Sequence, residues 1–265
     1  MSILNNVFSP LEQFQIIPIY VLGNSSEFLT ITNQTIVFFA CFALIDEYFL
    51  YTFYTNKSYT IVNYNFTIVP SKIQTFLELI YRLVLSLVVD NIRHQDGQKY
   101  FPLIFSLFVM LLTYNLVGLL PYSYTITSQL IVTISISLSI FFGINIICIN
   151  KHKIKFFCLF LPSGTSISLG FLLVPIELIS YIFKPISLAV RLFVNMMAGH
   201  TLLKVIAGFA CSLMSATKIF LFILGFIPLV ILLPLFALEF GVALIQSFVF
   251  CILICIYLND SLNLH

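Results

Sequence analysis

Seven acidic or basic side chains interrupt the apolar C-terminal part of the chain, and their chemistry includes binding and passing on protons. Apart from its very end, the last hundred residues contain only Glu177, Lys184, Arg191, His200, Lys204, Lys218 and Glu239. A charged side chain at the centre of a bilayer costs from about 2.5 to more than 10 kcal/mol. In a membrane segment, each of these groups must therefore face a partner, a water-filled space or a membrane surface.

Arg191 differs from the other cations because a guanidinium stays charged when it is desolvated, whereas an ammonium can lose its proton. It can attract a carboxylate but cannot relay a proton. Ser187, Arg191 and Asn195 share one helix face at i, i+4 and i+8. Ala198, Gly199 and Leu202 continue this face. Another helix could approach such a face closely. An ion pair with Glu177 is the alternative, but fourteen residues of helix separate the two by about 21 Å.

His200 and Glu239 are the groups that could take up and release protons. His200 follows Arg191 by nine residues, half a turn round and about 13 Å along a helix, so it points away from the guanidinium. Glu239 is the only charged residue of its apolar stretch, and Gln246 lies on the same face two turns later. A proton path and a static interhelical hydrogen bond explain this pattern equally well.

The remaining charges have simpler expected roles. Glu177 and Lys184 lie on one face with Tyr181 between them, which favours a self-neutralising pair over a direct part in transport. Asp46 and Glu47 are expected at an interface with a basic partner segment. Extension toward a membrane surface is the expectation for Lys204 and Lys218.

The composition is that of an integral membrane protein. Of 265 residues, 60% are hydrophobic and 8% are charged, which is too much apolar surface for one water-soluble globule. The apolar runs are too long for barrel strands, so the fold class is all-α. The net charge of +2 and the lack of a basic block argue against nucleic-acid binding. Six cysteines without CxxC spacing indicate neither a metal site nor a disulfide framework, and nothing indicates a cofactor.

The elements are expected to form a single membrane domain over residues 1–265. A first transmembrane span covers about 32–55, and an amphipathic helix at 71–95 carries a narrow polar stripe suited to a membrane surface. Residues 99–150 form a transmembrane hairpin around an uncharged turn.

Residues 166–258 consist of two apolar runs of about 40 to 50 residues each. As a helix, each run would be longer than about 60 Å, which is about twice the bilayer thickness. Either each run breaks at its prolines into two spans, or each is one bent and steeply tilted helix. Periodicity does not choose between these two arrangements. The prolines are Pro175, Pro185, Pro228 and Pro234.

Orientation follows from the basic residues, which gather around the amphipathic helix and in the loop 151–155. By the positive-inside rule both regions face the side of synthesis, and the N-terminus faces the opposite side. The C-terminus lies on the side of synthesis if each long run crosses once. The N-terminus has no leader-like character, so either a short leader is trimmed or synthesis occurs next to the membrane.

Two stretches, "PISLAVRLFVNMMAGHTLLKVIAGF" and "LPLFALEFGVALIQSFVFCILICIYLND", resemble the proton-channel subunit, subunit a, of F-type ATP synthases. "SPLEQFQI", "YFPLIFSLFVMLLTYNLVGLLPYSY" and "PSGTS" extend the resemblance over nearly the whole chain. It implies long tilted helices that form a hairpin against a rotating ring of c subunits. It also implies a non-catalytic subunit with a peripheral-stalk subunit b, small membrane subunits and lipid as further neighbours.

The resemblance also implies roles for individual residues. Arg191 matches the essential arginine and Asn195 the asparagine beside it, while His200 and Glu239 match the pair in the half-channel through which protons enter. Gln246 matches a glutamine that faces the arginine region, and the last matching position, in the earlier hairpin, is Asn115.

The placement of the histidine and the glutamate resembles the mitochondrial branch of the family. This implies the mitochondrial inner membrane, with the N-terminus in the intermembrane space and the C-terminus in the matrix. The acidic pair Asp46/Glu47 and the absence of tryptophan depart from the family pattern and bear on partner contacts. Two other classes remain open on the residues alone. A secondary transporter would show inverted repeats, of which the sequence shows none, and a structural scaffold would need no single charge for transport.

Overall fold

The computed structural model describes residues 12–21, 30–57, 72–92, 97–120, 123–153, 156, 167–215 and 219–262. Four of its helices are long and apolar enough to cross a membrane: α3 (Gly97–Gly118), α4 (Leu130–His152), α5 (Ile167–Met214) and α7 (Phe226–Leu262). By length and composition, these helices agree with the predicted all-α membrane protein. Lys218, the whole "PSGTS" motif and the start of "SPLEQFQI" lie outside the described residues.

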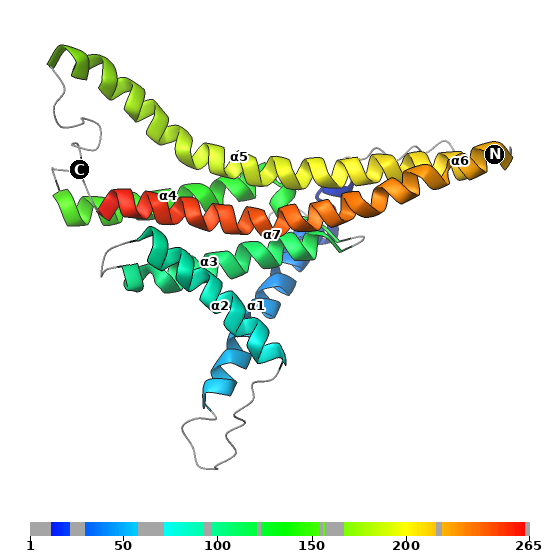
Figure 1. Ribbon diagram of the computed structural model, residues 1–265, viewed down its shortest axis with the longest axis horizontal. Helices are drawn as coiled ribbons and strands as arrows, with labels where there is room; N and C mark the ends of the chain where they lie inside the picture. The colour runs from blue at the N-terminus through cyan, green and yellow to red at the C-terminus, as the bar shows by residue number, and fades with distance from the viewer. Residues whose placement is uncertain are drawn as a thin grey trace.

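The long pair α5 and α7 dominates the molecule, and the two helices run side by side over much of their length (Figure 1). Helix α5 continues through Pro175 and Pro185, and α7 continues through Pro234. An interior proline removes one backbone hydrogen bond and bends a helix without always ending it. The ribbon of α5 accordingly bends, and its N-terminal part diverges from α7 (Figure 1). Each apolar run therefore contains one long helix.

The break in the second run lies at a glycine and not at a proline. The short helix α6 (Ile219–Leu224) ends there, and α7 begins after a turn at Gly225. A β-carbon at Gly225 would lie 2.8 Å from Cγ of Met214, so the close return of the chain onto α5 requires a residue without a side chain. Pro228 falls in the first turn of α7, where its missing N–H disturbs no helix hydrogen bond.

The main core lies where α2 (Lys72–Asn91), α3, α5 and α7 meet. Helix α2 buries Val84 and Val88 in this core and exposes the opposite face, on which Arg82 and Glu78 lie 3.8 Å apart. The predicted amphipathic character of this segment thus corresponds to packing against α3 and α7. Its position at a membrane surface stays a prediction.

Helix α1 (Asn33–Lys57) packs against α3 and the following turn through a small cluster that includes Cys41, Tyr114 and Ile126. Asp46 and Glu47 are exposed on α1, where a partner could reach them. Because the side chains beyond Glu47 on this helix are not among those described, the expectation of a first transmembrane span remains a prediction.

Two small features were not expected from the sequence. Near the N-terminus, a one-turn helix η1 (Glu12–Phe14) precedes an antiparallel pair of short strands, β1 (Pro18–Val21) and β2 (Thr30–Thr32). Between α3 and α4, the turn contains a second one-turn helix, η2 (Ile126–Ser128), whose residues are all buried. These two features meet where the chain connects α3 to α4, and there Gln129 donates a hydrogen bond to the carbonyl of Phe14.

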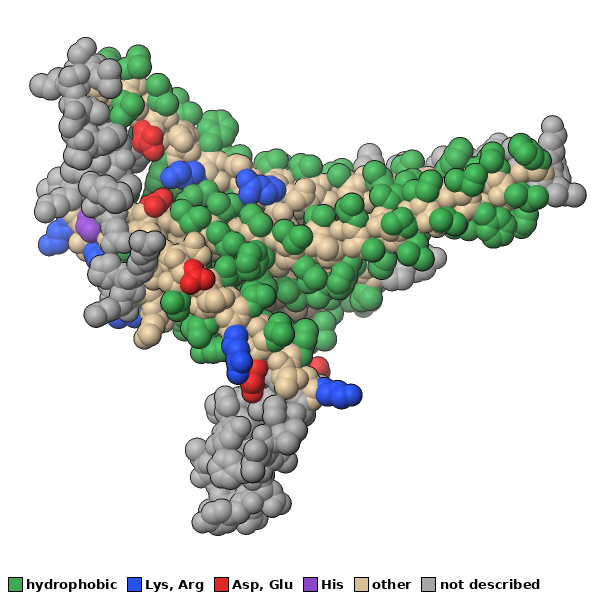
Figure 2. Space-filling model, viewed as in Figure 1, with side chains coloured by type: hydrophobic (Ala, Val, Ile, Leu, Met, Phe, Trp, Pro, Cys, Tyr) green, Lys and Arg blue, Asp and Glu red, His purple; other side chains and the backbone are tan. Residues whose placement is uncertain are grey.

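The outer surface is largely apolar. Hydrophobic side chains cover the arm formed by α5, α6 and α7 on the face that Figure 2 shows, and the charged groups visible on that face gather in the other half of the molecule and at the end of α2. Such a surface is suited to lipid or to apolar partner helices.

Candidate functional site

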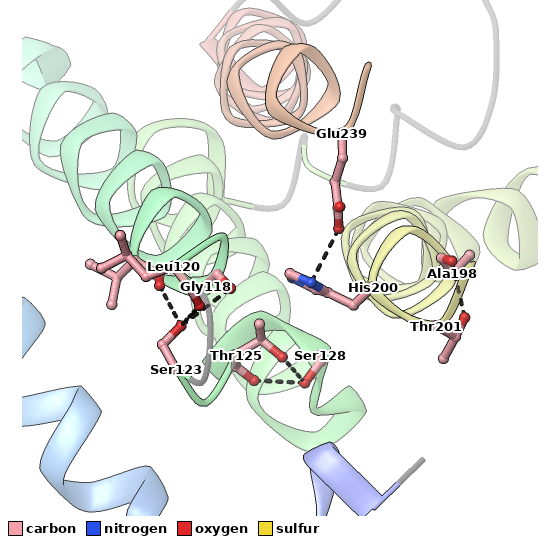
Figure 3. Close-up of polar contacts among 10 residues, drawn as sticks. Gly118, Leu120, Ser123, Thr125, Ser128, Ala198, His200, Thr201 and Glu239 are labelled. Atoms are coloured by element: carbon pink, nitrogen blue, oxygen red, sulfur yellow. Dashed lines mark hydrogen bonds and ion pairs between the residues drawn. The ribbon is translucent and has the colours of Figure 1, made fainter. Parts of the chain in front are cut away.

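The two predicted proton-transfer residues meet between the long helices. Nδ1 of His200 on α5 lies 3.2 Å from Oε1 of Glu239 on α7 (Figure 3). Their side chains are 14% and 4% exposed, respectively. Helical spacing could place each residue on a face of its own helix but could not show that the two faces meet. The structure brings the two groups into direct contact.

This pair keeps hydrogen-bonding capacity that the described residues do not use. Nε2 of His200 and Oε2 of Glu239 are buried and have no hydrogen-bond partner in the described part of the chain, whereas Oε1 of Glu239 contacts Nδ1 of His200. Most buried polar atoms in proteins are hydrogen-bonded, and such an exception calls for a functional explanation. Imidazole and carboxylate can each hold or release one proton, so the pair can bind protons in the interior.

The close contact depends on a glycine. A β-carbon at Gly199 would lie 2.8 Å from Oε1 of Glu239 and 3.1 Å from its carboxyl carbon, closer than van der Waals contact permits. The absence of a side chain at this position lets α7 bring its carboxylate against α5. Gly199 belongs to the face on which a close helix approach is expected from the sequence, but its contact with Glu239 depends on how α5 and α7 pack.

A second polar contact joins α5 and α7 nearer to Arg191. Nδ2 of Asn195 donates a 2.9 Å hydrogen bond to Oε1 of Gln246, which is 5% exposed. Asn115 of α3 is fully buried and donates a 3.2 Å hydrogen bond to the carbonyl of Ala243, one turn from Glu239. Three helices therefore supply polar side chains to one continuous region around the His200–Glu239 pair.

Arg191 lies apart from that region. It occupies the centre of α5 and is exposed, as is Ser187 one turn earlier, whereas the adjacent Leu192 is completely buried. No carboxylate of the described residues lies within ion-pair distance of Arg191, and Glu177 is no exception. Arg191 is thus exposed at the surface of α5, where it interacts electrostatically with Tyr257 of α7.

The expected ion pair between Glu177 and Lys184 is not formed in the described part of the structure. The ammonium of Lys184 instead lies 5.6 Å from the ring centroid of Tyr181 and 5.3 Å from that of Tyr257 on α7. The Tyr181 hydroxyl also donates a hydrogen bond to Oδ1 of Asn145 on α4. Contact with two aromatic rings is favourable for a cation, which explains why Lys184 turns toward the rings.

Two residues that contact Lys184 or Tyr181, namely Tyr257 and Asn145, were not predicted from the sequence. Both are polar residues in apolar helices, which is a signal, but the contacts require knowledge of how α4 and α7 pack against α5. Lys204, which is expected to extend toward a membrane surface, is half-buried on α5.

Comparison with known proteins gives a consistent result over the whole chain. The family model described as ATP synthase A chain matches residues 34–259. The ATP synthase subunit a of Chondrus crispus is 45% identical over 98% of this chain and 98% of its own length. The subunits of the same name from Pylaiella littoralis and Brassica napus are 47% and 43% identical, over 97% of this chain and 99% and 97% of theirs. The chain belongs to the family of ATP synthase a subunits.

Proposed function

We propose that this chain is the stator subunit of a rotary ATP synthase, a non-catalytic subunit that conducts protons through two half-channels separated by Arg191. The observation that carries the proposal is the buried contact between His200 and Glu239, two proton-binding groups with unused hydrogen-bonding capacity. A proton path needs groups that bind and release protons, and this pair supplies two of them at one buried place.

In this proposal, His200 and Glu239 receive protons in the inlet half-channel. The amides of Asn115, Asn195 and Gln246 border this half-channel and hold α3, α5 and α7 in register around it. Amide side chains can both donate and accept hydrogen bonds, so they can hold water against the helices without taking up a net proton themselves.

Arg191 separates the half-channels and meets the rotor. An exposed guanidinium at the centre of an apolar helix cannot face lipid without a large cost, so this side of α5 requires a partner with negative charge. A ring of c subunits that each carry a carboxylate supplies that partner. A ring carboxylate enters lipid only when it is protonated, and it is stabilised as an ion when it faces Arg191.

The guanidinium also prevents a direct leak between the half-channels. It holds its own protons too tightly to relay one, and its charge repels an arriving cation. A proton therefore crosses only by riding on the ring. Glu177, Tyr181 and Lys184 lie on the other side of Arg191 along α5, where they line the outlet half-channel or fix α5 beside it.

The membrane in which this happens is the mitochondrial inner membrane, with the N-terminus in the intermembrane space and the C-terminus in the matrix. This part of the proposal rests on the distribution of basic residues and on the placement of histidine and glutamate along the chain. Each proton that crosses 100 mV releases about 2.3 kcal/mol, so rotation must gather several protons for each ATP. Subunit b of the peripheral stalk and small membrane subunits complete the surroundings.

The decisive experiment is ATP-driven proton pumping in membrane vesicles that carry the whole complex with Arg191→Ala, with the amount of assembled complex measured in parallel. We expect normal assembly and loss of pumping. Arg82→Ala is the matched control, because Arg82 is an exposed arginine on α2 that pairs with Glu78, and this variant should pump normally. Intact pumping by the Arg191→Ala complex would show that the guanidinium is structural.

A further inference from the structure

The turn between α3 and α4 carries a group of buried hydroxyls that the mechanism above does not use. Thr125, Thr127 and Ser128 are 4%, 0% and 4% exposed. Oγ1 of Thr125 donates a 2.6 Å hydrogen bond to Oγ of Ser128, which in turn donates a 2.6 Å hydrogen bond to the carbonyl of Thr125. Oγ1 of Thr127 is buried and has no partner among the described residues. Burying hydroxyls is costly, so three in one short turn require an explanation.

This turn lies against α5 close to His200. A β-carbon at Gly118 would lie 2.9 Å from Cγ2 of Thr125 and 3.7 Å from Cε of Met196, which precedes His200 by one helical turn. Figure 3 shows the Thr125–Ser128 pair on the side of the His200 ring that faces away from Glu239. In this view, Glu239, His200 and the hydroxyl pair follow one another, and the turn that carries the pair contacts α5.

The turn that carries the hydroxyl pair contacts the exposed N-terminal segment of the chain. The next residue, Gln129, donates a 2.8 Å hydrogen bond to the carbonyl of Phe14, and residues 15–20 of the N-terminal segment are exposed. Asn33 fixes the same segment, since its side chain donates to the carbonyl of Gln15 and accepts from the backbone N–H of Ile17. The N-terminal segment appears below the turn in Figure 3, in the dark blue it has in Figure 1. Among the described residues, this exposed segment is the part of the chain that the turn contacts through Gln129.

We propose that the Thr125–Ser128 hydroxyl pair is a proton-relay site of the inlet half-channel, located between His200 and the water beyond the N-terminal segment. This proposal rests on the proposed function, because it adds an outer station to the same path. It gives the buried turn a role that packing alone does not explain.

The chemistry of the pair suits this role. A hydroxyl accepts a proton on a lone pair and releases the proton that it already carries, so it ends each transfer unchanged. Nε2 of His200 is buried without a partner, and the orphan Oγ1 of Thr127 adds a further polar atom in the turn. Buried polar atoms of this kind are commonly joined by water, which completes a path from the exterior to the imidazole. The proton that enters at the hydroxyl pair leaves on the His200–Glu239 pair, and no other group is consumed.

The test uses the whole complex with Thr125→Val and Ser128→Ala, which remove both hydroxyls with little change in volume. Proton-driven ATP synthesis is measured per assembled complex while the pH on the side of the N-terminal segment is varied. We expect the rate to fall about tenfold, the kinetic equivalent of one lost hydrogen bond, and a lower pH to be needed for the half-maximal rate. Thr125→Ser with Ser128→Thr keeps both hydroxyls and should restore the rate and the pH profile.

Two matched controls are buried hydroxyls of α4. Thr133 and Ser137 are 0% and 2% exposed, and their hydroxyls donate to carbonyls of their own helix. The complex with Thr133→Val and Ser137→Ala should synthesise ATP at the normal rate. If the turn variant does not assemble, Ser128→Ala alone serves as the test, with the same expected direction.

The possible failures are distinguishable. A normal rate and a normal pH profile without the turn hydroxyls, together with impaired synthesis in His200→Ala, would overturn the relay site and leave the proposed function in place. Normal synthesis in His200→Ala and in Glu239→Gln would overturn the proposed function itself.

Discussion

The side-chain amide of Asn195 donates a 2.9 Å hydrogen bond to Gln246 and so ties α5 to α7 between Arg191 and the His200–Glu239 pair. Because of its position, this one hydrogen bond between helices lies next to both Arg191 and the His200–Glu239 pair of the proposed mechanism. A change here is expected to disturb both.

Gln246→Leu removes this hydrogen bond and leaves the amide of Asn195 unsatisfied. We expect the free energy of unfolding of the assembled complex to fall by about 1–3 kcal/mol, the cost of a buried polar group without its partner. In the double variant Asn195→Leu/Gln246→Leu, neither amide remains, so the loss should be smaller than the sum of the two single losses. Thermal inactivation is measured for the wild type, the two single variants and the double variant, which together form a double-mutant cycle. If the two single losses of stability add up to the loss in the double variant, the two amides do not interact.

Glu239→Gln keeps the shape of the side chain but removes its ability to bind and release a proton. We expect proton-driven ATP synthesis to fall by about 100-fold or more, the usual effect of losing a proton-transfer group. Assembly should be unaffected. Glu47→Gln is the matched control, since Glu47 is an exposed carboxylate on α1. A Glu239→Gln complex that synthesises ATP at the normal rate would remove Glu239 from the path.

Gly199→Ala introduces a methyl group 2.8 Å from Oε1 of Glu239. The far end of the Glu239 side chain must shift, so we expect slower proton flux with only a small loss of stability, because a flexible side chain can move away at little cost. Gly208→Ala on the same helix is the control, because nothing lies within 4 Å of the added carbon. That variant should keep its flux and gain slightly in helix stability, by up to about 1 kcal/mol. Equal behaviour of the two variants would contradict the close contact at Gly199.

The sequence was sufficient for features that depend on one helix at a time. Helical periodicity correctly separated the outward-facing Arg191 from the inward-facing His200, because nine residues of a helix fix their relative direction. Composition and run length were likewise sufficient for the α-helical membrane fold. Such properties are local, and the residues themselves determine them.

Features that depend on two helices could not be obtained in this way. The contact of His200 with Glu239 and the packing of Lys184 against Tyr257 depend on the register of α5 against α7. The expected pairing of Glu177 with Lys184 was wrong. The ammonium of Lys184 lies instead against the ring of Tyr181 on α5 and that of Tyr257 on α7, and the second contact depends on helix packing. The short strands and η2 were missed because their sequences lack a strong periodic signal.

The outward position of Arg191 has a consequence for biogenesis. Before its partner arrives, the newly inserted chain presents a guanidinium to lipid from the middle of its longest helix, and the surrounding bilayer must thin or admit water to accommodate it. The chain without its partner is therefore less stable in the membrane than the assembled one, and we expect it to be degraded faster. We expect Arg191→Leu to lengthen the half-life of the chain in cells that lack the ring, and an unchanged half-life would show that turnover depends on another feature.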